Sequence, residues 1–552
     1  MNIRCFGKIV SLILSLTMIL VMVACSKSPG QESDEAKPDK SASTADSSPD
    51  ESSKTKDDET EEKEHYTITM YHPLHPTHSL EDIPKSGFYI DNMYEEMFNI
   101  EFDIQYVPAT NEEEVFNITM ASGDIPDLVR AGNLDRLRKY ADAWWDLNEF
   151  IVGKYANLEK HFFDDPYVHA LSAEQNGQIK ILSMLSEQFI GDVLLVRGDL
   201  VEEWEIDLST VKTKEDWYDI FKLVKEKDSK VIPYMTRMGT EGMTHRLCEG
   251  WSGIRQYEFV DGDSTVKYGA ADPRMKEIVE WLNKLYKEGL IDQEYPSTDT
   301  PAWQEQLLGE GIFLTHDNAS SRIRWADTEW NNLGVTDKYY MAVPPIQPDE
   351  NTEGFTTIHY PRLRNTIAIH VGAEEGKVDR ILEMIDYTFG EEGYILSNYG
   401  IEGVSFEYNA EGEIDYIPEY QKAVDDKTMP MEDVIRGTFI EFTRIEPNGI
   451  YMPQNRDYER IVAAAKLYED GGLIKRNYLE AVHFTEEEQK EITNLNADIK
   501  TYTDENLDQF ILGSKSLDEW DDFVAGYETL QLDRYLEIYN TALQRALELI
   551  EE

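Results

Sequence analysis

Segments with a strand pattern and segments with a helix pattern alternate along this chain from residue 66 onward. Residues 66–71 and 101–107 alternate polar and apolar side chains, as half-buried strands do. Residues 111–122 follow, with Asn111 as a plausible cap and acids in the first turn, and then a further strand at 127–129. This order of strands and helices predicts βαβ units and an open, largely parallel sheet.

The rest of the body continues the pattern. Val378, Ile381, Leu382 and Ile385 recur at three- and four-residue spacing, which places them on one apolar helix face. Gly123 and Gly289 stand where helices should end in a left-handed residue. We expect a strand at 194–196 and helices at 89–99, 214–227, 273–288, 377–387, 392–398 and 535–551.

The first residues have the layout of a secretory signal. Arg4 and Lys8 precede an apolar run at 9–24, which is short for a membrane span and stops at Cys25. The ending Met22-Val23-Ala24-Cys25 resembles the lipobox of bacterial lipoproteins. We therefore expect a signal peptide over residues 1–24, a lipid on Cys25, and anchoring at the outer face of the cell membrane.

A polar tether is expected between this anchor and the body. Residues 26–64 contain no aromatic residue and no Leu, Ile, Val or Met. Such a segment buries too little apolar area to offset the entropy of ordering it. Residues 25–64 are therefore predicted to be a lipidated cysteine followed by a disordered tether.

Charge and cysteine content exclude some functions. The 552 residues carry 52 Lys and Arg against 108 Asp and Glu, a formal net charge of −56, which repels a nucleic-acid backbone. After removal of the signal only Cys25 and Cys248 remain, and Cys25 is expected to carry lipid. No disulfide within the mature chain is expected, and Cys248 is expected to be a small buried residue rather than a nucleophile.

Five stretches, in order along the chain, resemble the extracellular solute-binding proteins of ABC importers (family 1 type). The resemblance is to the large lipoprotein branch of Gram-positive bacteria. The stretches are residues 120–129 (MASGDIPDLV), 197–200 (RGDL) with 213–221 (TKEDWYDIF), 285–292 (LYKEGLID), 390–394 (GEEGY) with 398–403 (NYGIEG), and 536–542 (LEIYNTA).

The resemblance implies an α/β fold of the periplasmic-binding-protein-like type II, with two α/β lobes, a hinge and a ligand cleft between the lobes. It places residues 65–185 plus 365–402 in lobe 1 and residues 186–364 plus 403–552 in lobe 2. Chain crossings are expected near 182–188, 359–366 and 400–406. The implied function is capture of a carbohydrate, an oligosaccharide, for import by the membrane subunits of an ABC transporter. The protein is then a monomer and not an enzyme.

No cofactor and no metal are expected. Relatives carry a calcium loop of the form DPxGNGxxDEIP, whereas residues 228–233 here read DSKVIP and lack the glycine and the second set of acids. His72 and His75 lie close in sequence, but no acid or cysteine with zinc-site spacing accompanies them.

Candidate ligand contacts follow from sugar chemistry, since sugars offer C–H faces to aromatic rings and hydroxyls to polar groups. Arg322 and Arg364 suit hydroxyls or a carboxylate. Asp124 is expected near the end of a strand–helix unit, where open α/β sheets bind ligands. The full candidate set is Trp251, Phe406, Trp303, Tyr71, His72, Asp124, Asp317, Asn318, Arg322 and Arg364.

Two alternatives stay open at this stage. A lipoprotein that binds peptides or another solute has the same organisation. An exported glycoside hydrolase needs two carboxylates across a cleft, and 108 acids make such a pair uninformative. No G-x-S-x-G elbow, Walker loop or H-E-x-x-H motif occurs.

Overall fold

The computed structural model describes one compact unit that begins at Lys63. The predicted signal peptide, Cys25 and nearly all of the tether lie outside the described residues. In the part of the chain that is described, no helix is both long and apolar enough to cross a membrane. The described residues are 63–74, 80–83, 89–132, 134–187, 192–262, 264–309, 311–358, 362–420, 422, 444–448, 452–453 and 458–551.

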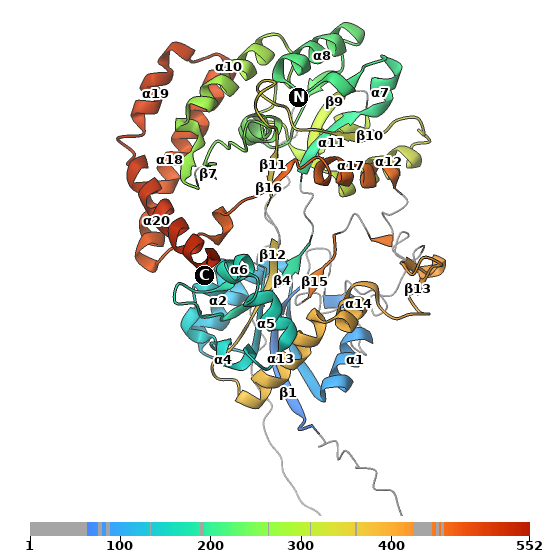
Figure 1. Ribbon diagram of the computed structural model, residues 1–552, viewed down its shortest axis with the longest axis vertical. Coiled ribbons are helices and arrows are strands. Elements are labelled where there is room, and N and C mark those ends of the chain that lie inside the picture. Colours follow the sequence, from blue (N-terminus) through green and yellow to red (C-terminus); the bar gives the residue numbers. More distant parts are fainter. Residues whose placement is uncertain are drawn as a thin grey trace, which may run out of the picture. The chain divides into compact units, whose positions relative to one another are not determined.

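A six-stranded sheet forms the centre of the first lobe (Figure 1). β1 pairs in parallel with both β2 and β3, whereas β12 is antiparallel to β3 and to β4. The strand order is β15 (Ile445–Glu446), β4 (Ile181–Ser186), β12 (Arg362–Ile369), β3 (Leu128–Ala131), β1 (Tyr66–Pro73) and β2 (Ile100–Val107).

Helices cover both faces of this sheet because each buries one apolar stripe. Ile68 and Ile367 of the sheet share a core with Ile381 and Ile385, which are on the helix face predicted from sequence. The helices of this lobe are α1 (Tyr89–Phe98), α2 (Glu112–Ser122), α3 (Leu134–Arg138), α4 (Asn148–Ile151), α5 (Ala156–Phe162), α6 (Pro166–Ser172), α13 (Glu375–Phe389) and α14 (Glu391–Tyr399).

A four-stranded sheet forms the centre of the second lobe. Its order is β10 (Tyr340–Val343), β5 (Asp192–Arg197), β9 (Ile312–Asn318) and β6 (Ile232–Tyr234), with only β6 and β9 parallel. The helices are α7 (Gly198–Glu203), α8 (Lys214–Lys227), α9 (Gly239–Glu241), α10 (Pro273–Lys287), α11 (Thr300–Leu308), α12 (Ala319–Asn332), α17 (Glu459–Glu469), α18 (Glu486–Leu512) and α19 (Trp520–Gly526).

Three two-stranded pairs complete the strands. β11 (Thr356–Ile358) pairs with β16 (Ile474–Arg476), β13 (Phe406–Tyr408) with β14 (Ile414–Tyr416), and β7 (Glu258–Val260) with β8 (Val266–Tyr268). β11 ends at Ile358, and β12 of the first lobe begins at Arg362.

The local predictions and the largely parallel sheet are confirmed. The helix predicted at 214–227 is α8, with Thr213 and Asp216 forming a capping box, and Gly123 ends α2 with φ 74°. Each sheet is largely parallel, with one strand that runs against the others, β12 in the first sheet and β5 in the second. The physical reason is that β12 and β5 each arrive from the other lobe and so enter their sheet at the opposite edge from the βαβ strands.

One expected lobe boundary differs. Residues 403–552 were assigned to the second lobe, yet Ile445 and Glu446 pair in parallel with β4 of the first lobe. Instead of crossing between lobes, residues 400–406 lead from α14 into the β13–β14 hairpin. The fourth family-like stretch ends at Gly403. No pattern in the sequence after it indicated that residues 445–446 return to the sheet of the first lobe.

Two polar sheet edges lie near each other because the chain connects them directly. β4 ends at Ser186 and β5 begins at Asp192. An extended chain advances at most about 3.6 Å per residue, so these two ends lie within about 20 Å. The carboxyl ends of β1, β3 and β4 in the first lobe therefore lie opposite the carboxyl ends of β6 and β9 in the second.

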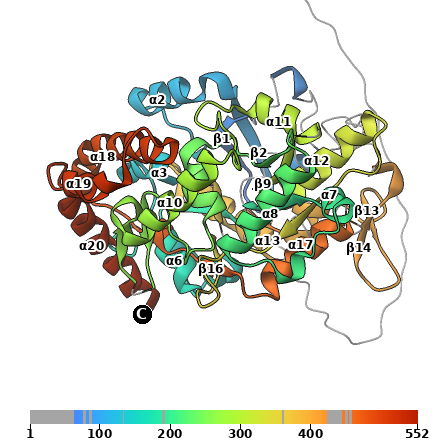
Figure 2. The same ribbon diagram turned by 90° about the horizontal axis from the view of Figure 1, so that it is seen from above.

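The C-terminal helix α20 (Leu532–Glu551) contacts both lobes. Asn540 Oδ1 accepts a hydrogen bond from the Val266 backbone N–H at 2.8 Å, which holds α20 to the β7–β8 pair. Further along, Ala546 packs with Tyr167 and Leu171 of α6 in the first lobe. Figure 2 shows α18, α19 and α20 gathered on one side of the molecule.

Candidate functional site

Two arginines and an aspartate meet at the carboxyl end of β9. Arg322 Nε, on α12, donates to Asp317 Oδ2 at 2.7 Å, and Arg237 Nη2, from the segment after β6, donates to Asp317 Oδ1 at 3.2 Å. Asp317 is 6% exposed. The apolar residues of β9 hold the strand in the sheet. Its polar carboxyl end therefore places Asp317 and its two arginine partners at the edge of the sheet.

A buried tryptophan lies beneath both guanidinium groups. The guanidinium carbons of Arg322 and Arg237 lie 4.5 and 4.8 Å from the ring centroid of Trp303. The Trp303 indole N–H donates to Thr315 Oγ1 at 3.0 Å, which fixes the ring. Arg322 also lies 4.6 Å from the ring of half-buried Trp325. We call Arg237, Arg322, Asp317 and Trp303 the arginine shelf.

The shelf has hydrogen-bond donors to spare. Among the described residues, Arg237 Nε is buried without a hydrogen-bond partner, and neither Nη atom of Arg322 is hydrogen-bonded. The side chains of Arg237 and Arg322 are 30% and 12% exposed, so both reach the surface. Two positive charges thus meet one carboxylate.

His316 lies on the other face of β9, since neighbouring strand residues point to opposite faces. It is 4% exposed, and neither ring nitrogen is hydrogen-bonded to a described residue. Burial, reinforced by the positive charge of Arg246, lowers the His316 pKa to about 3, so the ring is neutral at pH 7. Arg246 belongs to a π-helix, Gly242–Leu247, a distortion often found at functional sites.

The facing edge of the first lobe also carries basic side chains. Arg130 Nη1 lies 3.3 Å from His72 Nε2 and donates to the Pro73 carbonyl at 3.1 Å. Burial, with Arg130 nearby, lowers the pKa of His72 well below its ordinary value. Arg364, at the start of β12, is exposed and lies 3.5 Å from Glu446.

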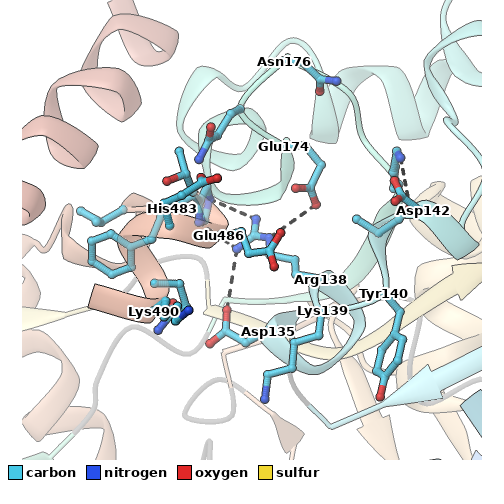
Figure 3. A pocket seen from close by; sticks show the side chains of 18 of the residues that line it. Asp135, Arg138, Lys139, Tyr140, Asp142, Glu174, Asn176, His483, Glu486 and Lys490 are labelled. Carbon is cyan, nitrogen blue, oxygen red and sulfur yellow. Dashed lines mark hydrogen bonds and ion pairs between the residues drawn. The ribbon is translucent and has the colours of Figure 1, made fainter. Parts of the chain in front are cut away.

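A separate cavity of about 1590 Å³ lies between α3, residues 174–180 and the start of α18 (Figure 3). Arg138 occupies its centre. Its Nη1 donates to His483 Nδ1 at 2.8 Å and its Nη2 to the Leu171 carbonyl at 2.8 Å. His483 Nε2 lies 2.9 Å from the Ala170 carbonyl, which selects the tautomer with the proton on Nε2.

None of the four predicted aromatic platforms is exposed: Trp251 and Phe406 are 2% exposed, and Trp303 and Tyr71 are fully buried. The structure therefore differs from the expectation of open stacking surfaces. Trp251 packs against Trp281 in the core of the second lobe, with ring centroids 6.1 Å apart.

The glycines beside Trp251 have another role than loop flexibility. A Cβ on Gly250 would overlap the Ile346 carbonyl, so this glycine permits close backbone packing. Phe406 is enclosed by the rings of Tyr399 and Tyr408. Tyr71 packs edge-on against Phe116.

The polar candidates divide into groups. The structure brings Asp317 and Arg322 together, while Asn318 caps α12 by accepting from the Ser321 N–H at 3.1 Å. Asp124 is exposed and precedes β3, so it lies near the amino ends of the strands, opposite the edge expected for ligand binding. The end of the strand–helix unit formed by β2 and α2 is the end of a helix, and the chain there has returned to the amino ends of the strands.

Sequence reasoning omitted Arg237 and Trp325, whereas His316 was considered with Asp317 and Asn318 as a polar residue at the end of an apolar strand. The rule that polar residues after an apolar strand line a site was applied to β9, and the same rule applied to β6 would have selected Arg237. Trp325 follows Arg322 by three residues on α12, a spacing that places both on one helix face.

Cys248 is buried, as predicted. Trp144, one of two adjacent tryptophans, is 1% exposed and lies in the core. Across the described ranges no group of three or more His, Cys, Asp or Glu side chains is arranged to hold a metal ion.

Comparison with curated proteins finds distant relatives with consistent names. The chain is 23% identical over 326 residues to Lipoprotein LipO and 22% identical to the polygalacturonan/rhamnogalacturonan-binding protein YtcQ, both of Bacillus subtilis (strain 168). Each match covers 56% of this chain and 62% of the relative, so the chain spans less than two thirds of their length. Two relatives from Streptococcus pneumoniae are named as substrate-binding proteins of carbohydrate ABC transporters.

Comparison with solved structures identifies the fold. A human-milk-oligosaccharide (HMO)-binding solute-binding protein from Bifidobacterium longum infantis ATCC 15697 superposes with a TM-score of 0.70. The identity is 15%, and the match covers 87% of this chain and 99% of the other. No protein-family model matches the chain. The protein has the two-lobed α/β fold of type II solute-binding proteins and is a distant relative of the substrate-binding proteins of carbohydrate ABC transporters.

Proposed function

We propose that this protein captures an oligosaccharide outside the cell and delivers it to the membrane subunits of an ABC importer. The observation that carries the proposal is the pair of polar sheet edges, connected through residues 187–191, with the arginine shelf on one of them. The names of the relatives support an oligosaccharide as the solute.

Capture in this fold works by closure. A sugar that touches the shelf and the Arg130–His72 edge stabilises the state in which both edges contact it, because only that state gains both sets of contacts. The membrane subunits then distinguish loaded from empty protein by the arrangement of the lobes.

Binding without chemical change is part of the proposal. A glycosidase needs one carboxyl group that gives up a proton. Asp317 instead accepts hydrogen bonds from Arg322, Arg237 and the Asn318 backbone N–H. The side chain of Asp317 is thus occupied in holding the two arginines, which suits a binding site.

The proposed location is the outer face of the cell membrane. A thioether lipid on Cys25 together with an acyl chain on its amino group gives the two attachments that stable anchoring requires. A tether of about forty residues, without aromatic residues, Leu, Ile, Val or Met, then separates the body from the lipid.

Calorimetric titration of the full chain in mild detergent tests this function. Neutral and acidic oligosaccharides are titrated one by one, and each sugar is analysed by mass spectrometry afterwards. We expect saturable binding with the sugar recovered intact. Recovery of shortened sugar would contradict the proposal, and so would binding confined to peptides.

A further inference from the structure

We propose that the solute is an anionic oligosaccharide whose sugar carboxylates are bound by Arg237 and Arg322 on the arginine shelf. This inference rests on the proposed function and specifies the chemical class of its ligand. The ligand class is a chain of uronic acid units.

The first argument is charge balance at the shelf. Two guanidinium groups share one carboxylate, Asp317, and Arg322 is only 12% exposed. A partly buried charge without its own counter-ion is costly, and a protein retains one where a partner of opposite charge arrives. A ligand carboxylate supplies the missing negative charge.

The second argument is geometry. Nε of Arg322 is used by Asp317, which leaves its two Nη atoms in a planar fork that matches the two oxygens of a carboxylate. Arg237 contributes a further unpaired N–H. Trp303 and Trp325 hold the Arg322 guanidinium at 4.5 and 4.6 Å, so the fork is fixed before the ligand arrives.

His316 adds an observation from the opposite face of β9. Its imidazole is 4% exposed and lacks hydrogen-bond partners among the described residues, while its electrostatic neighbours include Arg246 and Arg237. A neutral ring offers one donor and one acceptor, which suits a sugar hydroxyl. Arg246 is itself 3.3 Å from Glu241, so it brings its own counter-charge.

The charge of the whole chain differs in sign from that of the side chains proposed to bind the ligand. The whole chain has about twice as many acids as bases, 108 against 52. At the facing edge of the first lobe, Arg130 lies beside His72, and exposed Arg364 lies 3.5 Å from Glu446. Basic side chains exposed on a negatively charged molecule favour the approach of an anionic ligand to these edges.

The test compares oligogalacturonides and alginate oligomers with their methyl esters, which keep the sugar ring and lose the charge. Each is titrated calorimetrically into the full chain in mild detergent, and neutral oligosaccharides are titrated in parallel. We expect one of the uronate series to bind at least tenfold more tightly than its ester.

Variants assign that preference to the shelf. Arg322→Gln and Arg237→Gln should each weaken the uronate at least tenfold and change ester binding less than threefold. Arg534→Gln is the matched control, since Arg534 is an exposed arginine on α20 paired with Glu491 and Glu537. It should leave both affinities unchanged.

The outcomes separate the two proposals. Tight binding of a neutral oligosaccharide with no loss in Arg322→Gln would overturn the anionic ligand and leave oligosaccharide capture standing. A uronate that binds equally in wild type and both variants would also overturn it. Failure of every saccharide, charged or neutral, would overturn both proposals.

Discussion

Arg138 and Arg322 are both largely buried, yet their surroundings differ. The two Nη atoms of Arg138 donate to His483 and to the Leu171 carbonyl, and Glu174 and Asp135 lie 3.8 and 4.0 Å away. Arg322 donates only through Nε, to Asp317, although it lies at the edge of a sheet where ligands bind in this fold.

The difference separates an arginine that holds the protein together from one that is prepared for a ligand. The Arg138 cluster connects α3 of the first lobe to residue 483, at the approach to α18 of the second. Both Nη atoms of Arg138 are hydrogen-bonded to the protein, and only its Nε, 3.8 Å from Glu174, has no hydrogen-bond partner among the described residues. The shelf leaves donors unsatisfied and carries excess positive charge, which is stable only with water or a ligand present.

Acidification is the largest expected perturbation. Burial, with the positive charge of Arg138, lowers the His483 pKa to about 3, below the ordinary value near 6.5. The stabilisation from keeping this ring neutral is complete above about pH 6.5 and is lost as the pH falls toward 3. Denaturant unfolding between pH 7 and 4 should show a loss on the order of 3 kcal/mol from this group. His483→Gln should flatten the profile, and an unchanged slope in that variant would contradict the assignment.

Loss of Arg138 should be the next largest effect. Arg138→Met leaves the His483 acceptor and the Leu171 carbonyl unpaired, at a cost of about 3 kcal/mol in the free energy of unfolding. Chemical denaturation measures it. Lys154→Met, at an exposed pair with Asp379, is the control and should cost less than about 0.5 kcal/mol. Equal losses of stability in the two variants would contradict a structural role for Arg138.

Arg322→Gln should cost about 1 kcal/mol in stability, because Arg237 still donates to Asp317 in the variant. The same denaturation series measures it beside Arg138→Met. A cost as large as that of Arg138→Met would mean that the shelf is structural.

Trp325→Ala should be the mildest of these changes in stability, below about 1 kcal/mol, since the ring is only half-buried. It releases one side of the Arg322 guanidinium, so uronate affinity should fall about threefold to tenfold. Chemical denaturation measures the loss of stability, and titration calorimetry on the folded variant measures the loss of affinity. An unchanged affinity would show that Trp325 does not position the guanidinium.

Local patterns predicted the elements of the fold well, because periodicity and caps are short-range signals. The α8 capping box and the left-handed Gly123 are examples. Long-range strand pairing could not be predicted. Ile445 pairs with Leu185 of β4, which is 260 residues earlier in the chain, and no local pattern near Ile445 indicates this pairing.

The sequence indicated which candidate residues follow a strand, but not which of them are buried. Asp317 and Arg322 were chosen from a strand end, and the structure brings their side chains together, whereas Trp251 and Phe406 were chosen by residue type and are buried. A tryptophan next to glycine looks the same in sequence whether the glycine makes a loop or permits close packing, as Gly250 does against Ile346.

Uronate titration of two variants side by side tests the central claim most directly. Arg322→Gln and Arg138→Gln are each titrated with the tightest-binding uronate oligomer, and the unfolding midpoint of each is recorded. The account predicts that Arg322→Gln loses at least tenfold in affinity with a nearly unchanged midpoint, and that Arg138→Gln loses stability but retains its affinity when folded. The reverse pattern, with binding lost at Arg138 and kept at Arg322, would contradict it.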